Sequence, residues 1–270
     1  MKITFIGGGN MASAMISGLL QQGYPANKIR VVEINEENRE KIEREFNIIT
    51  AVKIADGILD SNVILLTVKP QQISIVTKEL GPLLKEQLVI SIAAGIRIMD
   101  ICRWLGGYER VIRSMPNTPA IIRSAVTGLY ASSKVGMKER EDAETILSAI
   151  GSVLWLEHEE LMDVVTAISG SGPAYIFYFI EAMQQAGKEL GLDETQARQL
   201  SLETFLGAAK LANQKNEDVI TLRARVTSKN GVTERAIQIM EDYGVKNKII
   251  QAIQSSMRRS RELGDEFSGK

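Results

Sequence analysis

The chain has 270 residues, of which 44% are hydrophobic and 24% charged, and its formal net charge is −1. This length suits one large domain or two ordinary ones, and the near-neutral charge removes the electrostatic argument for nucleic acid or an anionic membrane as a partner. Cys102 is the only cysteine and His158 the only histidine, which excludes an intrachain disulfide, a thiolate cluster and a histidine-rich metal site. We expect no membrane span, because no apolar run reaches about 20 residues. The lone cysteine favours a reducing, cytoplasmic location, and the cysteine and histidine counts predict no metal.

The first predicted element is a strand at residues 3–6, which ends in the pattern Gly7-x-Gly9-x-x-Ala12. An apolar helical pattern follows at once, in the order that a dinucleotide-binding turn requires. Gly7 permits a tight turn, Gly9 leaves room for a pyrophosphate, and the small Ala12 allows the helix to pack closely on the sheet. The helix N-terminus would offer free N–H groups to the phosphates. The alternative is a glycine-rich turn without a ligand.

Apolar segments alternate with helical patterns through the first part of the chain. Strands are predicted at residues 3–6, 29–33, 63–68, 88–92, 110–113, 125–131 and 152–157. Between them, Asn35 is predicted to cap a helix, and a charged helix is expected at about 138–150. Alternation of this kind predicts a parallel sheet with helices on both faces, and hence a Rossmann-like doubly wound α/β fold.

The pattern changes after about residue 160, where helices alone are predicted. A long apolar helix is expected at 175–190, opened by Ser-Gly-Ser-Gly-Pro at 169–173, and Asp193 is expected to cap the next helix. A last helix is expected at 246–263, followed by a frayed tail at 265–270. The chain is thus predicted to combine a dinucleotide-binding Rossmann domain at 1–158 with an all-α domain at 159–270.

Ligands of open α/β sheets bind beyond the carboxyl ends of the strands. The segments that follow predicted strands include Thr-Val-Lys-Pro at 67–70, Ser-Ile-Ala-Ala-Gly at 91–95 and Met-Pro-Asn-Thr-Pro at 115–119. Lys69 is a candidate contact for a phosphate or ribose, and otherwise an ordinary solvated lysine. Glu33 ends the second strand and is a candidate acceptor for the adenosine ribose hydroxyls, where its charge would repel a 2′-phosphate. The alternative is a solvated glutamate.

Residues 228–233, Ser-Lys-Asn-Gly-Val-Thr, precede another predicted helix. Asn230 followed by Gly231 indicates a turn, because both residue types tolerate a left-handed backbone. Free N–H groups at the helix start, together with the hydroxyls of Ser228 and Thr233, would make a site for a carboxylate. A simple capped loop is the alternative. The segment 169–175 offers a similar helix start, which capping alone would also explain.

Taken together, these segments resemble the pyrroline-5-carboxylate reductase family. The segments at 7–12, 67–70, 91–95, 115–119, 169–175 and 228–233 occur in that family's order and spacing over essentially the whole chain. Met-Pro-Asn-Thr-Pro and Ser-Gly-Ser-Gly-Pro-Ala-Tyr are highly specific to it. The resemblance implies reduction of 1-pyrroline-5-carboxylate to L-proline with NADPH or NADH, the last step of proline biosynthesis. It also implies a Rossmann domain followed by a helical domain that forms a homodimer, and such dimers often assemble into decamers.

The resemblance implies roles for individual residues. Those expected to bind the cofactor are Gly7, Gly9, Asn10, Met11, Glu33, Val68, Lys69, Pro70, Ala93, Ala94 and Asn117. Those expected to bind the substrate are Ser228, Asn230, Gly231, Val232 and Thr233. The hydroxyl of Thr233 is the catalytic candidate, because the family places a hydroxyl there against the ring nitrogen. Two positions depart from the family's pattern, since Asn230 replaces a glycine and Val232 replaces a small residue and could crowd the substrate.

Two other functions remain open. A β-hydroxyacid dehydrogenase-like enzyme would have a similar layout but would use a lysine on the long central helix. Here the first lysine on that helix is Lys188, far from its N-terminal end. A non-catalytic regulatory paralogue would keep cofactor binding, and the changes at Asn230 and Val232 are compatible with it. The single histidine favours an enzyme whose cofactor carries the reactivity.

Overall fold

The computed structural model describes residues 1–215 and 217–269. Contacts divide the chain into two compact units, which we call the first unit (Met1–Ser171 and Ser256–Lys270) and the second unit (Gly172–Ser255). The end of the chain therefore returns to the first unit. The compact units are divided at other residues than the predicted domains 1–158 and 159–270. The predicted domains were assigned by function, and they stay a prediction.

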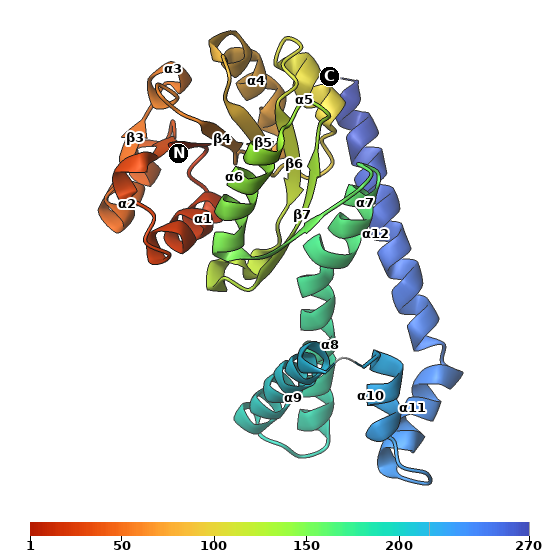
Figure 1. The fold of residues 1–270 in the computed structure, drawn as a ribbon. Coiled ribbons are helices and arrows are strands. Elements are labelled where there is room, and N and C mark those ends of the chain that lie inside the picture. Colours follow the sequence, from red (N-terminus) through yellow and green to blue (C-terminus); the bar gives the residue numbers. More distant parts are fainter. Residues whose placement is uncertain (216, 270) are drawn as a thin grey trace. The chain divides into compact units, whose positions relative to one another are not determined.

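The first unit contains one eight-stranded sheet in the order β3-β2-β1-β4-β5-β6-β7-β8 (Figure 1). Its strands are β1 (Ile3–Ile6), β2 (Ile29–Val32), β3 (Ile49–Ala51), β4 (Val63–Leu66), β5 (Leu88–Ser91), β6 (Val111–Met115), β7 (Ala125–Ala131) and β8 (Gly151–Trp155). All neighbours pair in parallel except β6 and β7, which are antiparallel. Residues 116–124 join that pair, and they are too few for the crossover that a parallel strand needs. The predicted doubly wound α/β fold is confirmed, with this one antiparallel exception.

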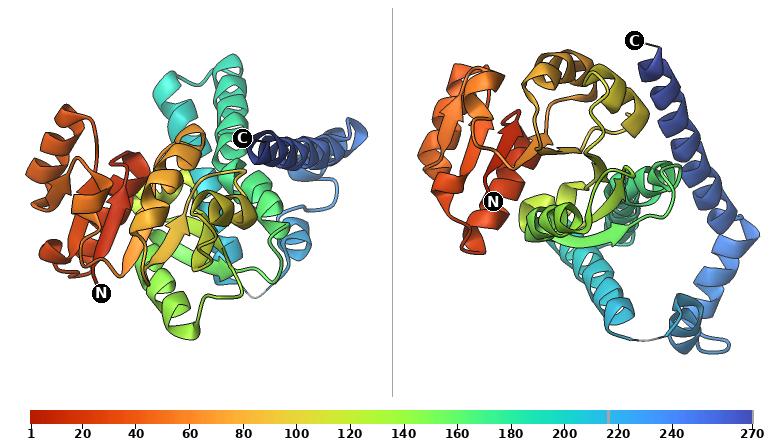
Figure 2. Two further views of the ribbon diagram at one scale, coloured as in Figure 1. Left: turned by 90° about the horizontal axis from the view of Figure 1, so that it is seen from above. Right: turned by 45° about the horizontal axis from the view of Figure 1, so that its top comes forward.

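Helices cover both faces of the sheet. They are α1 (Asn10–Gln21), α2 (Glu36–Phe46), α3 (Ile54–Gly57), α4 (Pro70–Leu80), α5 (Ile98–Trp104), α6 (Met137–Leu147), α7 (Leu161–Val165) and the end of α12 (Val245–Ser268). Short 3-10 turns occur at Ala26–Lys28, Gly81–Leu83, Thr118–Ile122 and Ser148–Ile150. The helices can be followed on either side of the sheet in Figure 2.

Two hydrophobic clusters lie on the opposite faces of this sheet. Successive side chains of a strand point to opposite faces, so Ile3 and Phe5 of β1 join one cluster and Ile6 joins the other. The first cluster includes residues of α1, α2 and α6, and the second includes residues of α4, α5 and α12. The central strands β1, β4 and β5 are therefore buried along their whole length, as parallel strands covered on both faces must be.

Strand β3 was not predicted from the sequence. It has three residues and lies at the edge of the sheet, where Ile49 is 52% exposed. An edge strand that is short and partly exposed lacks the continuous apolar run by which the other strands were recognised. Its existence depends on pairing with β2.

The long helix begins within the segment 169–173, as predicted, because α8 starts at Gly172. Residues Thr166–Gly170 form a π-helical turn directly after α7, and the N–H of Ser171 donates to the carbonyl of Thr166 at 2.9 Å. The backbone at Ser171 is right-handed helical, so this one residue separates the π-helical turn from α8. Widened turns of this kind occur mostly within helices and often at functional sites.

The prediction of a frayed tail at 265–270 is wrong for residues 265–269, while Lys270 lies outside the described residues. Helix α12 continues to Ser268, whose hydroxyl donates to Oδ2 of Asp100 at 2.6 Å. Asp265 forms a 2.6 Å ion pair with Arg97, and Phe267 is only 8% exposed. The partners lie more than 160 residues earlier in the chain, at Arg97 and Asp100, so local sequence patterns do not indicate them.

The second unit is helical throughout its described residues. It contains α8 (Gly172–Glu189), α9 (Glu194–Gln214), α10 (Val219–Arg225), α11 (Val232–Asp242) and the beginning of α12. Asp193 caps α9 as predicted, because its carboxylate accepts from the N–H of Gln196 at 2.9 Å. None of the described helices has the length and hydropathy of a membrane span.

The packing of α12 predicts the effect of shortening its last apolar side chain. Phe267→Ala should lower the free energy of unfolding by roughly 2–4 kcal/mol, because it leaves a cavity in the second hydrophobic cluster. Arg258→Ala on the exposed side of the same helix is the control and should change it by less than about 0.5 kcal/mol. Urea denaturation of both variants measures the difference. If Phe267→Ala and the wild type were equally stable, residues 265–269 would have to be interpreted as a frayed tail after all.

Candidate dinucleotide site and substrate loop

The turn between β1 and α1 has the backbone geometry of a phosphate-binding turn. Gly7 has φ +101°, and a Cβ at this position would lie 2.9 Å from Cγ1 of Val68. Gly9, in contrast, has no atom within 4 Å of the place where a Cβ would be, so it faces open space. Gly9 is also the N-cap of α1 and supplies no side-chain cap. The first N–H groups of α1 are thus available to an anion beside an unobstructed backbone.

Glu33 is held at this turn by donors of the protein itself. Its Oε2 accepts from the N–H of Gly8 at 2.9 Å and from Nδ2 of Asn38 at 3.0 Å, and its Oε1 accepts from the N–H of Asn35 at 2.9 Å. Burial by itself raises the pKa of Glu33, but the hydrogen bonds from Asn35, Gly8 and Asn38 outweigh it and lower the pKa. The residue is therefore an ionised carboxylate in a fixed orientation.

A cavity of about 560 Å³ lies at the carboxyl ends of β1, β2 and β4. Its lining includes five of the predicted cofactor residues: Gly7, Gly9, Glu33, Val68 and Lys69. It also includes residues that the sequence analysis did not select as site residues: Ile6, Gly8, Val32, Ile34, Asn35, Asn38, Val52, Ile54, Thr67, Gln72, Ile75, Val76 and Glu79. Val52 and Ile54 follow β3, and because that strand was missed, no signal pointed to them. Thr67 begins the segment 67–70, so it could have been found.

The remaining predicted cofactor residues lie outside this cavity but at related places in the sheet. Asn10 and Met11 begin α1, and Pro70 begins α4. Ala93 and Ala94 follow β5, where Ala93 is buried, and Asn117 follows β6. Because β4, β5 and β6 are parallel neighbours, these loops continue along the same edge of the sheet as the cavity.

Asn117 uses its side chain within the protein. Its Nδ2 donates to the carbonyl and to the hydroxyl oxygen of Ser169, each at 3.2 Å, and its Oδ1 accepts from the N–H of Val126 at 3.1 Å. Gly170 also approaches this loop, since a Cβ there would lie 2.6 Å from Cε of Met115. The two segments that are most specific to the family, 115–119 and 169–175, are thus joined in the structure by the hydrogen bonds between Asn117 and Ser169.

The predicted substrate residues lie together in one turn of the second unit. Asn230 has φ +59°, so it adopts the left-handed conformation that was expected where the family has glycine. Gly231 is the N-cap of α11, and a Cβ there would lie 2.5 Å from Oγ of Ser228. Val232 is 90% exposed, and Thr233 is half-buried in the first turn. The N–H groups of Val232 and Thr233 are at a helix start, where intrahelical partners are lacking.

One feature of this turn was not predicted. The N–H of Asn230 donates to Oε2 of Glu234 at 2.7 Å. This carboxylate on the first turn stabilises the helix N-terminus. It leaves the N–H groups of Val232 and Thr233, which the sequence analysis offered to a ligand carboxylate, outside this contact.

Cys102, His158 and Lys188 lie outside the segments that were predicted to bind cofactor or substrate. Burial raises the pKa of the Cys102 thiol on α5 to about 11, so little thiolate is present at neutral pH. His158 is exposed, as expected. Lys188 lies in the last turn of α8. Among residues 1–215 and 217–269, no group of three or more His, Cys, Asp and Glu side chains is arranged to hold a metal ion.

Comparison with known proteins assigns both parts of the chain. The family model described as "Pyrroline-5-carboxylate reductase dimerisation" matches residues 159–263. The family model described as "NADP oxidoreductase coenzyme F420-dependent" matches residues 2–95. A pyrroline-5-carboxylate reductase of Pseudomonas aeruginosa is 45% identical over 267 residues, which cover 98% of each chain.

Solved structures give the same result. A pyrroline-5-carboxylate reductase from Coxiella burnetii is 40% identical, covers 97% of this chain and 98% of its own, and superimposes with a TM-score of 0.92. A pyrroline carboxylate reductase of Plasmodium falciparum with NADP bound has a TM-score of 0.88. It covers 98% of each chain at 24% identity, a level at which the likeness concerns the fold.

The hydrogen bonds of Glu33 predict a pH-dependent contribution to stability. Its pKa in the folded protein is lowered, so its contribution is present above the unfolded pKa, near 4.5, and is lost as the pH falls through the folded value. Glu33→Gln should therefore lower the free energy of unfolding by roughly 1 kcal/mol at pH 7 and by less at pH 4. Urea denaturation at both pH values tests this, with the exposed Glu36→Gln as the control. If Glu33→Gln lowered the free energy of unfolding equally at pH 4 and pH 7, the charge of the carboxylate would be excluded as the cause.

Proposed function

Because the chain belongs to the pyrroline-5-carboxylate reductase family, we infer that it reduces 1-pyrroline-5-carboxylate to L-proline with NADH or NADPH. This reaction is the last step of proline biosynthesis. The observation that carries the inference is similarity over nearly the whole chain to reductases of that name. A match confined to the dinucleotide-binding part would leave other dehydrogenases open, since many share that part.

The first unit supplies what a dinucleotide needs. The open backbone at Gly9 and the N-terminus of α1 would receive the pyrophosphate, and Glu33 and Lys69 line the adjoining cavity. These residues fit an extended, anionic cofactor with an adenosine end. The predicted contacts of Asn10, Met11, Val68 and Pro70 with the cofactor, and of Ala93, Ala94 and Asn117 with its nicotinamide end, are part of the proposal.

The proposed chemistry makes few demands on the protein. A cyclic imine is readily protonated, and its iminium carbon is electrophilic, so the protein has to orient the ring rather than activate it. The bound nicotinamide supplies the hydride. The N–H groups at the start of α11 would hold the substrate carboxylate, with Ser228, Asn230, Gly231 and Val232 forming the turn. The Thr233 hydroxyl would hydrogen-bond the ring nitrogen or relay its proton.

We propose a homodimer as the functional form, formed through the helical part of the chain that matches the family's dimerisation model. Assembly beyond the dimer, into a decamer for example, is compatible with it. The single cysteine, Cys102, allows no intrachain disulfide and supports our proposal of a reducing, cytoplasmic location.

The direct test is oxidation of NADH and NADPH by the purified protein in the presence of 1-pyrroline-5-carboxylate, with L-proline identified as the product. Turnover of a β-hydroxyacid with NAD⁺, without turnover of the imine, would support the dehydrogenase alternative. Binding of NADH without turnover of either substrate would support a regulatory protein.

The first prediction from this proposed function concerns the choice of cofactor. Glu33 is an ionised carboxylate at the expected ribose position, so like-charge repulsion should weaken a 2′-phosphate, and NADH should be used at least as well as NADPH. Nearby, Arg39 donates to the carbonyls of Glu33 and Ile34 and is a positive charge that acts in the opposite direction. Values of kcat/KM for both cofactors decide the matter. Glu33→Gln should shift their ratio toward NADPH and Glu36→Gln should not, whereas a strong NADPH preference of the wild type would refute the prediction.

The second prediction concerns assembly. Helix α9 has only Ala197 and Ser201 buried within one chain, while Leu206 and Leu211 are 48% and 44% exposed. On α8, Phe177 and Tyr178 are 65% and 72% exposed. Apolar surface of this extent is normally covered by a partner, so we expect an obligate dimer. Analytical ultracentrifugation at micromolar concentration should show no monomer, and a stable, active monomer would disprove the prediction.

The third prediction concerns Thr233. Thr233→Val keeps the shape of the side chain and removes the hydroxyl. A hydrogen bond to a charged group contributes roughly 1.5–3 kcal/mol, so kcat/KM should fall roughly 10- to 150-fold if the bond is made in the transition state. Affinity for NADH should hardly change.

Thr227→Val is the matched control for that experiment. Its hydroxyl donates to the carbonyl of Arg223 at 2.7 Å and is expected to have no contact with substrate. Folding should survive both changes, because the N-cap of α11 is Gly231 and uses no side-chain bond. Near wild-type turnover of Thr233→Val would mean that the ring nitrogen receives its proton from water.

A further inference from the structure

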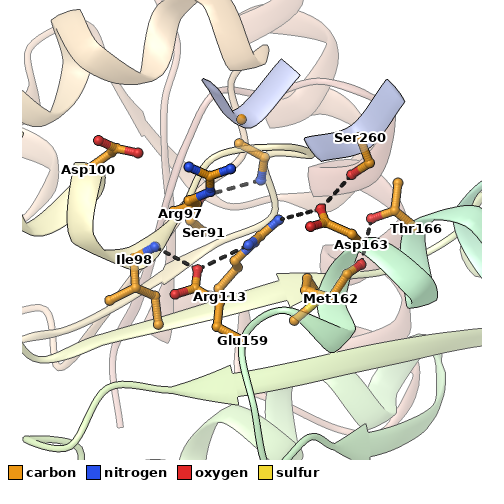
Figure 3. Close-up of polar contacts among 12 residues, drawn as sticks. Ser91, Arg97, Ile98, Asp100, Arg113, Glu159, Met162, Asp163, Thr166 and Ser260 are labelled. Atoms are coloured by element: carbon orange, nitrogen blue, oxygen red, sulfur yellow. Dashed lines mark hydrogen bonds and ion pairs between the residues drawn. The ribbon is translucent and has the colours of Figure 1, made fainter. Parts of the chain in front are cut away.

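Arg113 is a buried cation that is not among the predicted site residues. It lies on β6 and is only 3% exposed. One guanidinium nitrogen, Nη1, lies 3.0 Å from Oε1 of Glu159, and the other, Nη2, lies 3.8 Å from Oδ1 of Asp163. Figure 3 shows the guanidinium between these two carboxylates. A single side chain thus bridges two acids that are four residues apart.

Both carboxylates also accept hydrogen bonds from residues of other elements (Figure 3). Oε1 of Glu159 also accepts the N–H of Ile98 at 2.8 Å, which is the first residue of α5. Glu159 therefore satisfies a helix start whose N-cap, Arg97, makes no side-chain cap bond. Oδ1 of Asp163 accepts from the hydroxyl of Ser260 on α12 at 2.7 Å.

These elements adjoin three connecting segments at the carboxyl edge of the sheet. β6 leads directly into the loop 115–119, α5 follows the loop 91–95, and α7 leads into the π-helical turn Thr166–Gly170. Ser114, next to Arg113, donates its hydroxyl proton to the carbonyl of Ser91 at 3.1 Å. Asn117 and Ser169 join the other two loops directly. This edge continues that of the dinucleotide cavity, and ligands of open α/β sheets bind there.

Stability alone is a weak reason for such a cluster. Desolvation of a buried ion pair commonly cancels its Coulomb attraction, and apolar side chains of similar volume are often as stabilising. What a guanidinium adds is a rigid, planar fork that fixes the relative positions of two carboxylates. A lysine carries the same charge on a single nitrogen and lacks this fork.

We propose that Arg113 is a positioning residue for the reductase reaction. It holds the loops 91–95, 115–119 and 166–170 in the mutual arrangement that hydride transfer requires, and it acts through Glu159 and Asp163 without touching substrate. This proposal rests on the proposed function. Loss of the fork should displace the nicotinamide end of the site and leave the pyrophosphate contact at Gly9 and the ribose contact at Glu33 unchanged.

The test compares Arg113→Lys with Arg110→Met. Arg110 directly precedes β6, and its Nε makes a 2.9 Å ion pair with Glu139 of α6, so it controls for loss of a nearby arginine pair. Arg113→Lys should lower kcat roughly 10- to 100-fold, as expected of a small misplacement of reacting groups. The primary deuterium isotope effect on kcat, measured with deuterated NADH, should rise. Arg110→Met should change both by less than about twofold.

A binding measurement separates positioning from general damage. Calorimetry gives the dissociation constants of NADH and of ADP-ribose, which lacks the nicotinamide. In Arg113→Lys the affinity for ADP-ribose should stay within about twofold of wild type, while the advantage of NADH over ADP-ribose shrinks. Parallel loss of both affinities would overturn the proposal, because it would show a purely structural role. An unchanged kcat and isotope effect would overturn it as well.

Two controls complete the design. If Arg113→Lys does not fold, Glu159→Gln serves instead, since its amide oxygen can still accept the N–H of Ile98 while the charge is lost. It should show the same pattern with a smaller decrease in kcat. Wild-type turnover of 1-pyrroline-5-carboxylate tests the proposed function separately. If the wild type lacks that activity, the ratio of NADH to ADP-ribose affinity still decides whether Arg113 positions the nicotinamide loops.

Discussion

The parallel register of β1, β2, β4, β5 and β6 is the constraint on which the rest of the structure depends. Ile3 is level with Ile29 on one side and with Val63 on the other, and the same register continues through β5 to β6. The carboxyl ends of these strands therefore reach one edge together, where every predicted cofactor loop begins. A slip of one residue would turn the side chains of Ile3 and Phe5 to the opposite face. Because both faces are buried in separate clusters, the register is strongly specified.

At that edge, Glu33, Thr67, Asn117 and Arg113 are bonded within the protein. Glu33 accepts three hydrogen bonds, Asn117 joins two loops, and Arg113 bridges two carboxylates. The hydroxyl of Thr67 lies within hydrogen-bonding distance of the carbonyls of Ile6 and Gly7. What the turn offers to a ligand is the backbone at Gly9 and the start of α1. A rigid frame with backbone donors suits a reaction in which the protein aligns a cofactor that carries its own reactivity.

The end of the chain contributes to this frame. Helix α12 brings Ser260 to Asp163 and Asp265 to Arg97. It also places Phe267 in the second hydrophobic cluster, together with residues of α5. A Cβ at Gly264 would lie 3.0 Å from the carbonyl oxygen of Gly95, at the end of the loop 91–95. This close approach means that the last helix supports the loop from outside. The C-terminal residues are therefore part of the cofactor-binding unit, although they are farthest from it in sequence.

The sequence by itself determined the elements with strong local signals. The buried runs of β1, β4 and β5, the turn at Gly7 and Gly9, and the cap at Asp193 are set by side-chain hydrophobicity and backbone freedom within a few residues. The left-handed conformation of Asn230 follows in the same way. Family motifs then indicated the activity and named the candidate residues.

Only the tertiary structure decided the features that depend on distant partners. β3 exists because β2 pairs with it, and α12 stays helical to Ser268 because Arg97 and Asp100 bind its end. The π-helical turn Thr166–Gly170 before α8 was not predicted, and Asn117 donates to Ser169 within it. The proposed role of Arg113 could not be predicted from the sequence either. Its partners Glu159 and Asp163 are distant in sequence and reach it only in the folded protein. Hydrogen bonds and ion pairs between residues far apart in sequence leave no local sequence pattern. For this physical reason, only the tertiary structure could show these features.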